Sequence, residues 1–269
     1  MPALLPGAFT FFAMVWPALP GRGEQTIAAQ WDAGTGRGFW LGLTDGGTLT
    51  LKQDGERFSV DARMLKRQWY AVGLRIDTAS GHISLEQRRL QSYPFIADRG
   101  AISASIRPAT GASGFMLAGV ALAYGGIGQH FDGKIDSPCL LAGAHTLDDY
   151  AKLRQDSTAK HGDLIARWDF SRGLGTIRVE DTGPFGLHGT LVNLPTRGMK
   201  GWNWTGEAHD WRQQPEHYGA IHFYHDDLYD AGWAPSVTFA IPDDLKSGPC
   251  ALRIRSGPSD ETATREDYI

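Results

Sequence analysis

Short apolar segments separated by turn-forming residues recur along this chain, and they constrain its fold more than any other feature. Residues 39–43 and 48–53 alternate apolar and polar side chains on either side of the turn Asp45-Gly46-Gly47. An alternation with a period of two around such a turn indicates a β-hairpin. Further strands are predicted at residues 9–16, 26–31, 68–76, 82–88, 101–106, 115–120, 133–136 and 164–170. Short strands at intervals of roughly 8 to 12 residues favour an all-β sandwich.

The sequence pattern predicts three parts. Residues 1–170 hold these strands and one helix, which begins near Thr146 with Asp149 in an acidic capping box, and they are expected to form a jelly roll. Residues 171–233, rich in Trp and His, are predicted to be a linker packed on it. Residues 234–269 indicate the start of a second, immunoglobulin-like β-sandwich. Because two or three strands cannot bury a core of their own, we expect this last part to be truncated.

Composition and charge exclude several classes of function. The formal net charge is −4 and no basic stripe is present, so nucleic acid is not an expected partner. No window reaches the roughly 20 apolar residues of a membrane span, and the apolar N-terminal run has no Lys or Arg before it, unlike a signal peptide. Cys139 and Cys250 lie far apart, which suits neither a disulfide framework nor a zinc site. Reduced thiols predict a cytoplasmic protein.

The segment 187–233 concentrates aromatic side chains in a region of turn and loop chemistry, where only residues 220–224 are expected to form a strand. It contains four of the nine Trp residues, namely Trp202, Trp204, Trp211 and Trp233. These indoles could form a platform for a sugar, or they could fasten the segment to the sandwich. Glycines at 198, 201 and 206 allow tight turns, so we expect Trp202, Trp204 and Trp211 to be largely buried.

The same segment contains the residues best suited to bind a metal. Imidazole and carboxylate groups gather at His217, His222, His225, Asp226, Asp227 and Asp230. His222, His225, Asp226 and Asp227 are the candidate ligands, because these groups bind hydrolytic metals. On a strand, however, His222 and His225 point to opposite faces, so hydrogen-bonded anchoring of a loop is the alternative. Asp132 or Asp136 could bind calcium from a loop.

No catalytic residue is predicted from the sequence. It contains no Gly-x-Ser-x-Gly, the signature of one class of serine nucleophile. The paired carboxylates at residues 148–149 and 243–244 are adjacent in a helix start and a turn, which is the wrong geometry for two acids that face one bond. Arg197 and Lys200 could bind an anion, or they could form surface ion pairs.

Three motifs resemble a concanavalin A-like or laminin-G-like jelly roll. They are Trp16-Pro17 at the end of a strand, Trp69 with Val72 before a hairpin, and Gly133-Lys134-Ile135-Asp136. The resemblance implies a lectin-like sandwich. It also leaves open a stand-alone carbohydrate-binding module with a glycan as its partner.

A second resemblance rests on LHGTLVNLPTRGMKGWNW, HDWRQQPEHYGAIHFYHDDLYDAGW and IPDDLKSGPCALRI. These stretches are similar to the large (beta) subunit of N,N-dimethylformamidase. The resemblance implies an amide C–N hydrolase whose mononuclear iron is held by two Tyr and one Glu in a domain C-terminal to this region. Tyr218, Tyr224 and Tyr229 match none of those ligands, so no cofactor is expected in this chain.

The sequence therefore predicts a non-catalytic, lectin-like scaffold of a dimethylformamidase-like large subunit. Its expected partners are the rest of that subunit and a small subunit, with no nucleic acid and no membrane. Whether the chain is an enzyme by itself stays open at this point.

Overall fold

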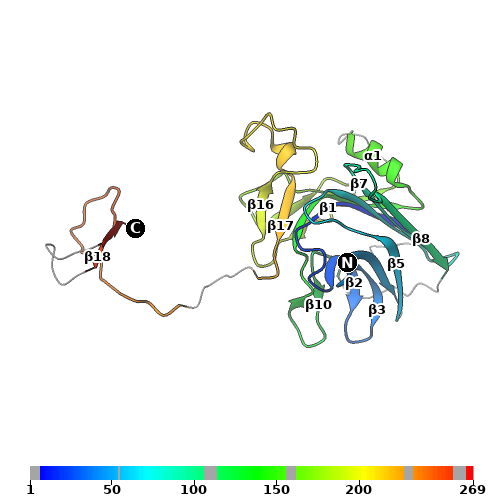
Figure 1. The fold of residues 1–269 in the computed structure, drawn as a ribbon, viewed down its shortest axis with the longest axis horizontal. Coiled ribbons are helices and arrows are strands. Elements are labelled where there is room, and N and C mark those ends of the chain that lie inside the picture. The colour runs from blue at the N-terminus through cyan, green and yellow to red at the C-terminus, as the bar shows by residue number, and fades with distance from the viewer. Residues whose placement is uncertain are drawn as a thin grey trace. The chain divides into compact units, whose positions relative to one another are not determined.

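The computed structural model describes residues 7–53, 55–105, 114–155, 162–226, 233–256 and 265–268. The chain divides into two compact units, Met1–Asp227 and Leu228–Ile269. The first unit is an all-β sandwich of two antiparallel sheets, as the spacing of apolar segments predicts. Figure 1 shows the two sheets as layers, with the helix α1 over the outer side of one of them.

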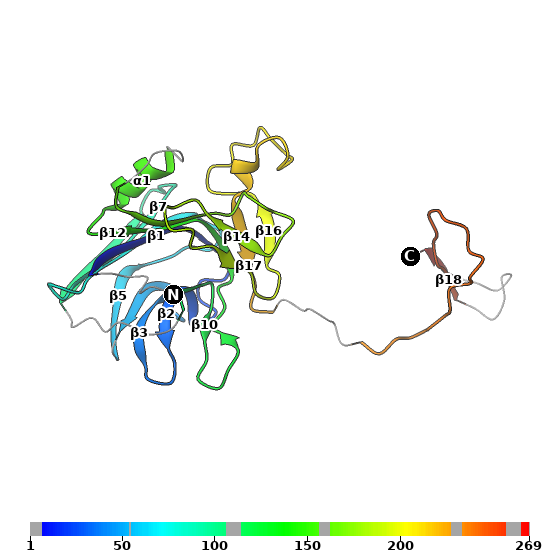
Figure 2. The same cartoon turned by 180° about the vertical axis from the view of Figure 1, so that it is seen from behind.

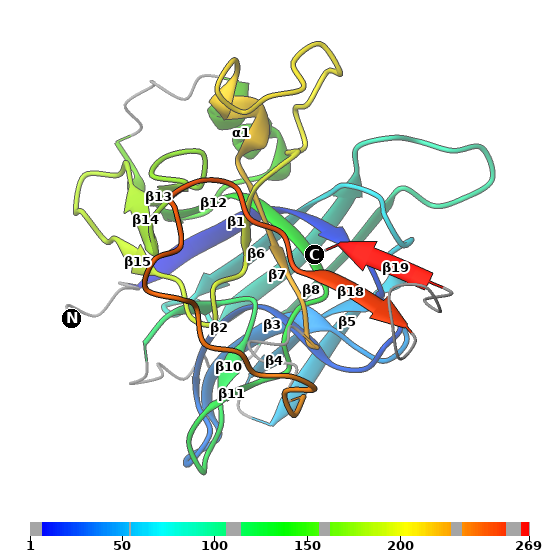
Figure 3. The ribbon, with the colours of Figure 1, turned by 90° about the vertical axis from the view of Figure 1, so that its left-hand side faces the viewer.

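The larger sheet has ten strands. Eight of them lie in the order β15-β14-β13-β12-β1-β6-β7-β8, while β17 pairs with β12 and β16 pairs with β17. Its strands are β1 (Ala8–Pro17), β6 (Tyr70–Asp77), β7 (His82–Arg89), β8 (Arg99–Ser105), β12 (Gly133–Ala142), β13 (Leu164–Asp169), β14 (Arg178–Asp181), β15 (Gly189–Thr190), β16 (Thr196–Met199) and β17 (Ala220–Phe223). Figure 3 shows β1, β6, β7 and β8 side by side.

The smaller sheet has the order β5-β4-β3-β2-β9. Its strands are β5 (Glu56–Arg63), β4 (Thr48–Gln53), β3 (Arg37–Leu43), β2 (Gln25–Asp32) and β9 (Met116–Leu117). A two-stranded ribbon, β10 (Val120–Ala121) with β11 (Ile127–Gly128), follows β9. Figure 2 shows this sheet and the ribbon from behind.

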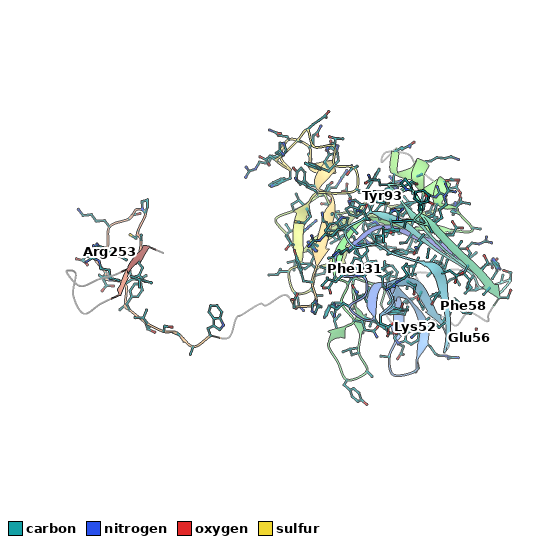
Figure 4. The ribbon with its side chains drawn as sticks, in the orientation of Figure 1. Lys52, Glu56, Phe58, Tyr93, Phe131 and Arg253 are labelled. Atoms are coloured by element: carbon teal, nitrogen blue, oxygen red, sulfur yellow. The ribbon has the colours of Figure 1, made fainter. Side chains whose placement is uncertain are left out.

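The side chains of β1 explain why its sequence is an unbroken apolar run. Phe11 points into the main core between the two sheets, whereas Phe12 belongs to a second cluster on the other face of the larger sheet. A strand buried on both faces is apolar at successive positions rather than at alternate ones. Phe131 also lies in the main core, and Figure 4 labels it between the two layers.

The helix α1 (Leu147–Gln155) covers the second cluster. The predicted capping box is confirmed: the backbone amide of Asp149 donates to Thr146 Oγ1 at 3.2 Å, and the amide of Thr146 donates to Asp149 Oδ2 at 3.0 Å. The ring of Tyr150 stacks on Phe12 with centroids 4.9 Å apart. The short hydrophobic stripe of this helix therefore covers the part of the outer face that β1, β6, β12 and β13 form.

Several elements differ from the sequence prediction. β5 was not predicted, because it lies at the edge of the smaller sheet with charged, exposed residues and Val60 as its fully buried side chain. β12 extends to Ala142 rather than ending at Asp136. The predicted strand at 115–120 is two separate short strands, β9 and β10. β9 pairs with β2 and β12 pairs with β1, partners about 90 to 130 residues away that local alternation does not reveal.

The larger sheet continues past residue 170, the expected end of the jelly roll. Strands β14 to β17 all belong to it, and the segment 187–226 thus contains β15 and β16 as well as the predicted strand. The physical reason is that β17 pairs with β12, with Ala220 opposite Asp136. A one-turn 3-10 helix, η1 (Pro215–Tyr218), leads into β17.

The second unit contains one described hairpin, β18 (Arg253–Ser256) with β19 (Arg265–Tyr268). The immunoglobulin-like character of this unit stays a prediction. No helix among the described residues is long and apolar enough to cross a membrane.

Candidate functional site

The four tryptophans of the Trp/His-rich segment differ in burial. Trp202 and Trp204 are half-buried, while Trp211 is 43% exposed and Trp233 is 87% exposed. The prediction of burial is therefore wrong for Trp211. The reason is local: residues 210–213 form a tight turn in which Asp210 accepts the amide of Arg212 at 2.9 Å, and this turn leaves the indole on the surface.

Trp202 fastens this segment to the larger sheet. Its indole Nε1 donates to Ser137 Oγ at 3.2 Å, and the Arg154 guanidinium lies 4.0 Å from its ring centroid. Trp204 is held more locally, by donation from Nε1 to the carbonyl of Ala208 at 2.9 Å and by Lys200 Nζ 3.7 Å from its ring. Both indoles satisfy their N–H group inside the protein, which is the arrangement expected of packing residues.

Asp136 is a buried carboxylate beneath the same segment. Its Oδ2 accepts the backbone amide of Trp202 at 3.3 Å, and its Oδ1 accepts the hydroxyl of Ser137 at 3.0 Å. Burial raises the pKa of this carboxyl to about 6, partly offset by these hydrogen bonds. A Cβ at Gly201 would lie 2.5 Å from Asp136 Oδ2, so only glycine allows the backbone to approach so closely. Asp136 thus acts as an anchor for the segment.

Arg197 does not form the anion site or the surface ion pair considered from the sequence. Its guanidinium donates to five backbone carbonyls at distances from 2.7 to 3.1 Å. Those carbonyls belong to Phe170, Arg172, Gly173, Thr176 and Arg178. One side chain from β16 therefore fixes the whole turn between β13 and β14. No local motif signals this role, because the partners are about 20 to 27 residues away.

The candidate metal ligands separate into two groups. His225 lies beside Asp132, with its backbone amide 2.8 Å and its Nδ1 2.9 Å from Asp132 Oδ1. Asp226 Oδ1 lies 3.6 Å from the same His225 Nδ1. His222 instead stacks on Tyr224, at 4.1 Å between centroids. Asp227 lies outside the described residues.

One ligand atom from each of Asp132, His225 and Asp226 lies within 4.8 Å of the others, which is close enough for one ion. Arg22 Nε, however, donates to Asp132 Oδ2, and His225 already bonds Oδ1. A metal would have to displace a guanidinium and a histidine from the same carboxylate. The contacts favour the alternative, in which this ion-pair cluster anchors the end of β17 to the loop before β12.

The tyrosines of this segment do not fit the iron site that the family resemblance implies. The Tyr218 hydroxyl is buried and donates to the carbonyl of Ala208 at 2.8 Å. The Tyr224 hydroxyl pairs with His222 Nδ1 at 2.8 Å. Tyr229 lies outside the described residues. Tyr218 and Tyr224 thus belong to different clusters, and neither faces a Glu in the described contacts.

A cavity of about 330 Å³ lies between the two sheets, at the side where β9 to β11 face β13 to β15 and β17. It is lined by Gly114, Phe115, Met116, Leu117, Ala118, Gly119, Ile127, His130, Trp168, Phe170, Val179, Leu187, His188, Gly189, Thr190, Leu191, Val192, Asn193, Pro195, Ile221, Phe223, Tyr224 and His225. Most of these side chains are apolar. Sequence reasoning singled out Tyr224 and His225 but missed Phe115, Trp168 and His188, which meet only because of the sheet pairing.

The family described as N,N-dimethylformamidase beta subunit-like, C-terminal, matches residues 196–269. The N,N-dimethylformamidase beta subunit of Paracoccus aminophilus is 31% identical over 99% of this chain and 37% of its own length. The corresponding subunit of Alcaligenes sp is 30% identical over 98% of this chain and 37% of its own. The chain thus spans little more than a third of these relatives.

Among solved structures, a putative carbohydrate binding protein from Bacteroides ovatus is similar with a TM-score of 0.48 and 15% identity, over 69% of this chain and 54% of that one. The CBM40 of a Ruminococcus gnavus sialidase gives a TM-score of 0.42 and 16% identity, over 56% and 83%. Sequence similarity, by contrast, extends along the whole chain to two curated subunits. The resemblance of this chain to the N,N-dimethylformamidase beta subunit family is thereby confirmed.

Proposed function

We propose that this chain is the N-terminal, lectin-like scaffold portion of an N,N-dimethylformamidase-like amide hydrolase and is not catalytic by itself. The observation that carries the proposal is the alignment of nearly the whole chain with 37% of a dimethylformamidase beta subunit. The rest of that subunit, and a small subunit, are the proposed partners. Free thiols at Cys139 and Cys250 support a cytoplasmic location.

The contacts of the segment 196–226 support a scaffold role. Asp136 holds Trp202, Arg197 holds the turn between β13 and β14, and Asp132 holds His225. Each of these polar groups binds the backbone or pairs with another side chain. The segment is therefore a rigid extension of the sandwich, suited to connecting it with further protein.

Amide hydrolysis provides the test. The 269-residue chain, with and without added iron, should release no dimethylamine from N,N-dimethylformamide above a heat-treated control. In a complete beta subunit that contains this chain, assembled with its partner, Tyr218→Phe and Tyr224→Phe should leave iron content and turnover unchanged. Loss of iron from Tyr224→Phe at an unchanged melting temperature would place a ligand in this chain and overturn the proposal.

The carbohydrate-binding alternative has one observation in its favour, the exposed indole of Trp211, with Arg212 at 5.3 Å from its ring. An exposed Trp of this kind can stack on a sugar ring. Retention of the chain on a glycan array, abolished by Trp211→Ala with the fold intact, would favour that function. Absence of retention leaves the scaffold as the better reading.

A further inference from the structure

We propose that the cavity between the two sheets is a binding site for a small, uncharged aromatic molecule that carries a hydrogen-bond acceptor such as a carbonyl oxygen. Neither the family relationship nor the scaffold function assigns a ligand to this place. Its volume, about 330 Å³, falls in the range of roughly 300 to 1,000 Å³ typical of small-molecule pockets.

The apolar wall of the cavity is preformed. Phe115 stacks on Trp168 with centroids 5.5 Å apart and an interplanar angle of 8°. Phe115 is itself held by Phe11 at 5.8 Å, and the indole Nε1 of Trp168 donates to the carbonyl of Leu187 at 2.7 Å. Ile221, fully buried on β17, also lines the cavity. Rigid aromatic surfaces of this kind favour a planar, apolar guest, because the wall does not have to be ordered when the guest binds.

The charge of the lining decides against an ionic ligand. No Asp, Glu, Lys or Arg is found among the described residues that line the cavity. A charged group inside it would lose its hydration without gaining a partner of opposite charge. The ligand is therefore neutral over the part that enters the cavity.

His188 supplies the polar contact. Its Nδ1 accepts the backbone amide of Asp181 at 3.1 Å, so in the neutral ring the proton is on Nε2. Both carboxylate oxygens of Asp181 are used in turn: Oδ2 accepts the amide of Leu187 at 2.7 Å, and Oδ1 accepts the amide of Gly183 at 2.7 Å. This network fixes the loop that carries His188 at the cavity. Within the described part of the chain the Nε2–H group has no acceptor, so it remains as a donor for an acceptor on a ligand in the cavity that His188 lines.

Two probes of nearly equal shape test the proposal on the complete 269-residue chain. Acetophenone has an aromatic ring and a carbonyl acceptor, whereas ethylbenzene has the ring without the acceptor. Ligand-observed NMR titration should show that both bind and that acetophenone binds about 3- to 10-fold more tightly, the factor expected for one hydrogen bond. The side-chain 1H–15N correlation of His188 should shift with acetophenone alone.

Two variants separate the hydrogen bond from the apolar wall. His188 is exposed, so His188→Ala should lower the melting temperature only by the loss of its hydrogen bond to the Asp181 amide, while it reduces acetophenone affinity to the level of ethylbenzene. A Cβ at Gly189 would lie 3.4 Å from Val179 Cβ, an ordinary contact beside the cavity, so Gly189→Leu should fill the space and abolish binding of both probes.

Any of three results would overturn the proposal. The first is that neither probe binds a correctly folded wild-type chain, which would mean that the cavity is closed or filled by protein. The second is equal affinity for both probes with no effect of His188→Ala, and the third is binding that survives Gly189→Leu. None of these results depends on whether the chain is a scaffold of an amide hydrolase, so the two proposals stand or fall separately.

Discussion

The backbone amide of Trp202 donates to the buried carboxylate of Asp136 at 3.3 Å, across 66 residues of sequence. This contact joins the Trp/His-rich segment to β12, and it places an acidic group where water is excluded. The stability of the protein should therefore depend on the protonation of one side chain.

Replacement of Asp136 by Asn should flatten the pH dependence of stability. Burial raises the pKa of Asp136 from 3.8 to about 6, so the folded state holds a proton that the unfolded state has released. Stability is therefore lost as the pH rises from about 4 to about 6, by an amount on the order of 2 to 3 kcal/mol. Differential scanning fluorimetry at pH 5 and pH 7.5 should show a smaller difference in Asp136→Asn than in the wild type. An equal difference in both proteins would show that another group is responsible.

Truncation of Trp204 should destabilise the protein more than truncation of Trp211. Trp204 is half-buried and bonded to Ala208, whereas Trp211 is 43% exposed. We expect Trp204→Ala to reduce the free energy of unfolding by about 1 to 3 kcal/mol, below the full cost of a buried aromatic, and Trp211→Ala to reduce it by about 0.5 kcal/mol or less. Urea denaturation measures both. Similar losses in the two variants would contradict the assignment of Trp204 as a packing residue.

Loss of the Arg197 side chain should be costly although it is not deeply buried. The guanidinium donates to five carbonyls, and Arg197→Ala leaves that turn without its donors. We expect Arg197→Ala to reduce the free energy of unfolding by about 2 to 4 kcal/mol. Arg197→Lys should be only slightly more stable than Arg197→Ala, because an ammonium group cannot reach five acceptors in a plane. Arg172→Ala is the control. Its exposed pair with Asp169 is worth about 1 kcal/mol or less. Full stability of Arg197→Lys would refute the planar clamp.

Mutation of the cluster of Asp132, His225 and Asp226 should lower the stability of the protein, whereas addition of a metal ion should not change it. Arg22 and His225 both pair with the buried Asp132, so Asp132→Ala removes the acceptor of both side chains. We expect the free energy of unfolding to fall by about 1 to 3 kcal/mol. Addition of zinc or calcium should not change the melting temperature of the wild type. An increase of several degrees with either ion, abolished by His225→Ala, would show a metal site instead.

Replacement of Phe95 by Gly should stabilise the protein. Phe95 follows Pro94 in a turn, adopts a φ of +64°, and exposes its whole ring. A side chain in this left-handed conformation destabilises the folded state by about 1 kcal/mol, and glycine avoids this strain. Glycine also increases the conformational entropy of the unfolded chain, which offsets part of the gain. We expect a gain of about 0.5 kcal/mol for Phe95→Gly. Phe95→Ala, which keeps the strain and removes the ring, should leave stability unchanged. A gain in both variants would assign the effect to the exposed ring.

Local chemistry was sufficient to predict the all-β class, the hairpins and the helix. The turn at residues 45–47 lies between β3 and β4, and Thr146 and Asp149 cap α1 as their spacing indicates. Each of these signals depends on residues that lie only a few positions apart in the sequence. The edge strand β5 escaped prediction because an edge strand buries few side chains and so shows little alternation.

The candidate site, in contrast, depends on which strands become neighbours. The segment around His222 and His225 was recognised as unusual, but the sequence left metal binding and loop anchoring open. Asp132, which pairs with His225, lies 93 residues earlier in the chain. Only the pairing of β17 with β12 brings that carboxylate to the histidine, and the resulting ion pairs with Arg22 favour anchoring.

The sequence by itself determined the all-β class, the hairpins at residues 39–53 and 68–88 and the capped helix, because turns, caps and alternation act between residues a few positions apart. It also showed the resemblance to the dimethylformamidase beta subunits, because similarity extends along 99% of the chain. The tertiary structure alone decided the roles of Asp136, Arg197 and His188 and the existence of the cavity that Phe115 and Trp168 line. These features require that segments tens of residues apart be paired in one register, and the free energy that selects the register comes from burying both faces of the larger sheet rather than from any local motif.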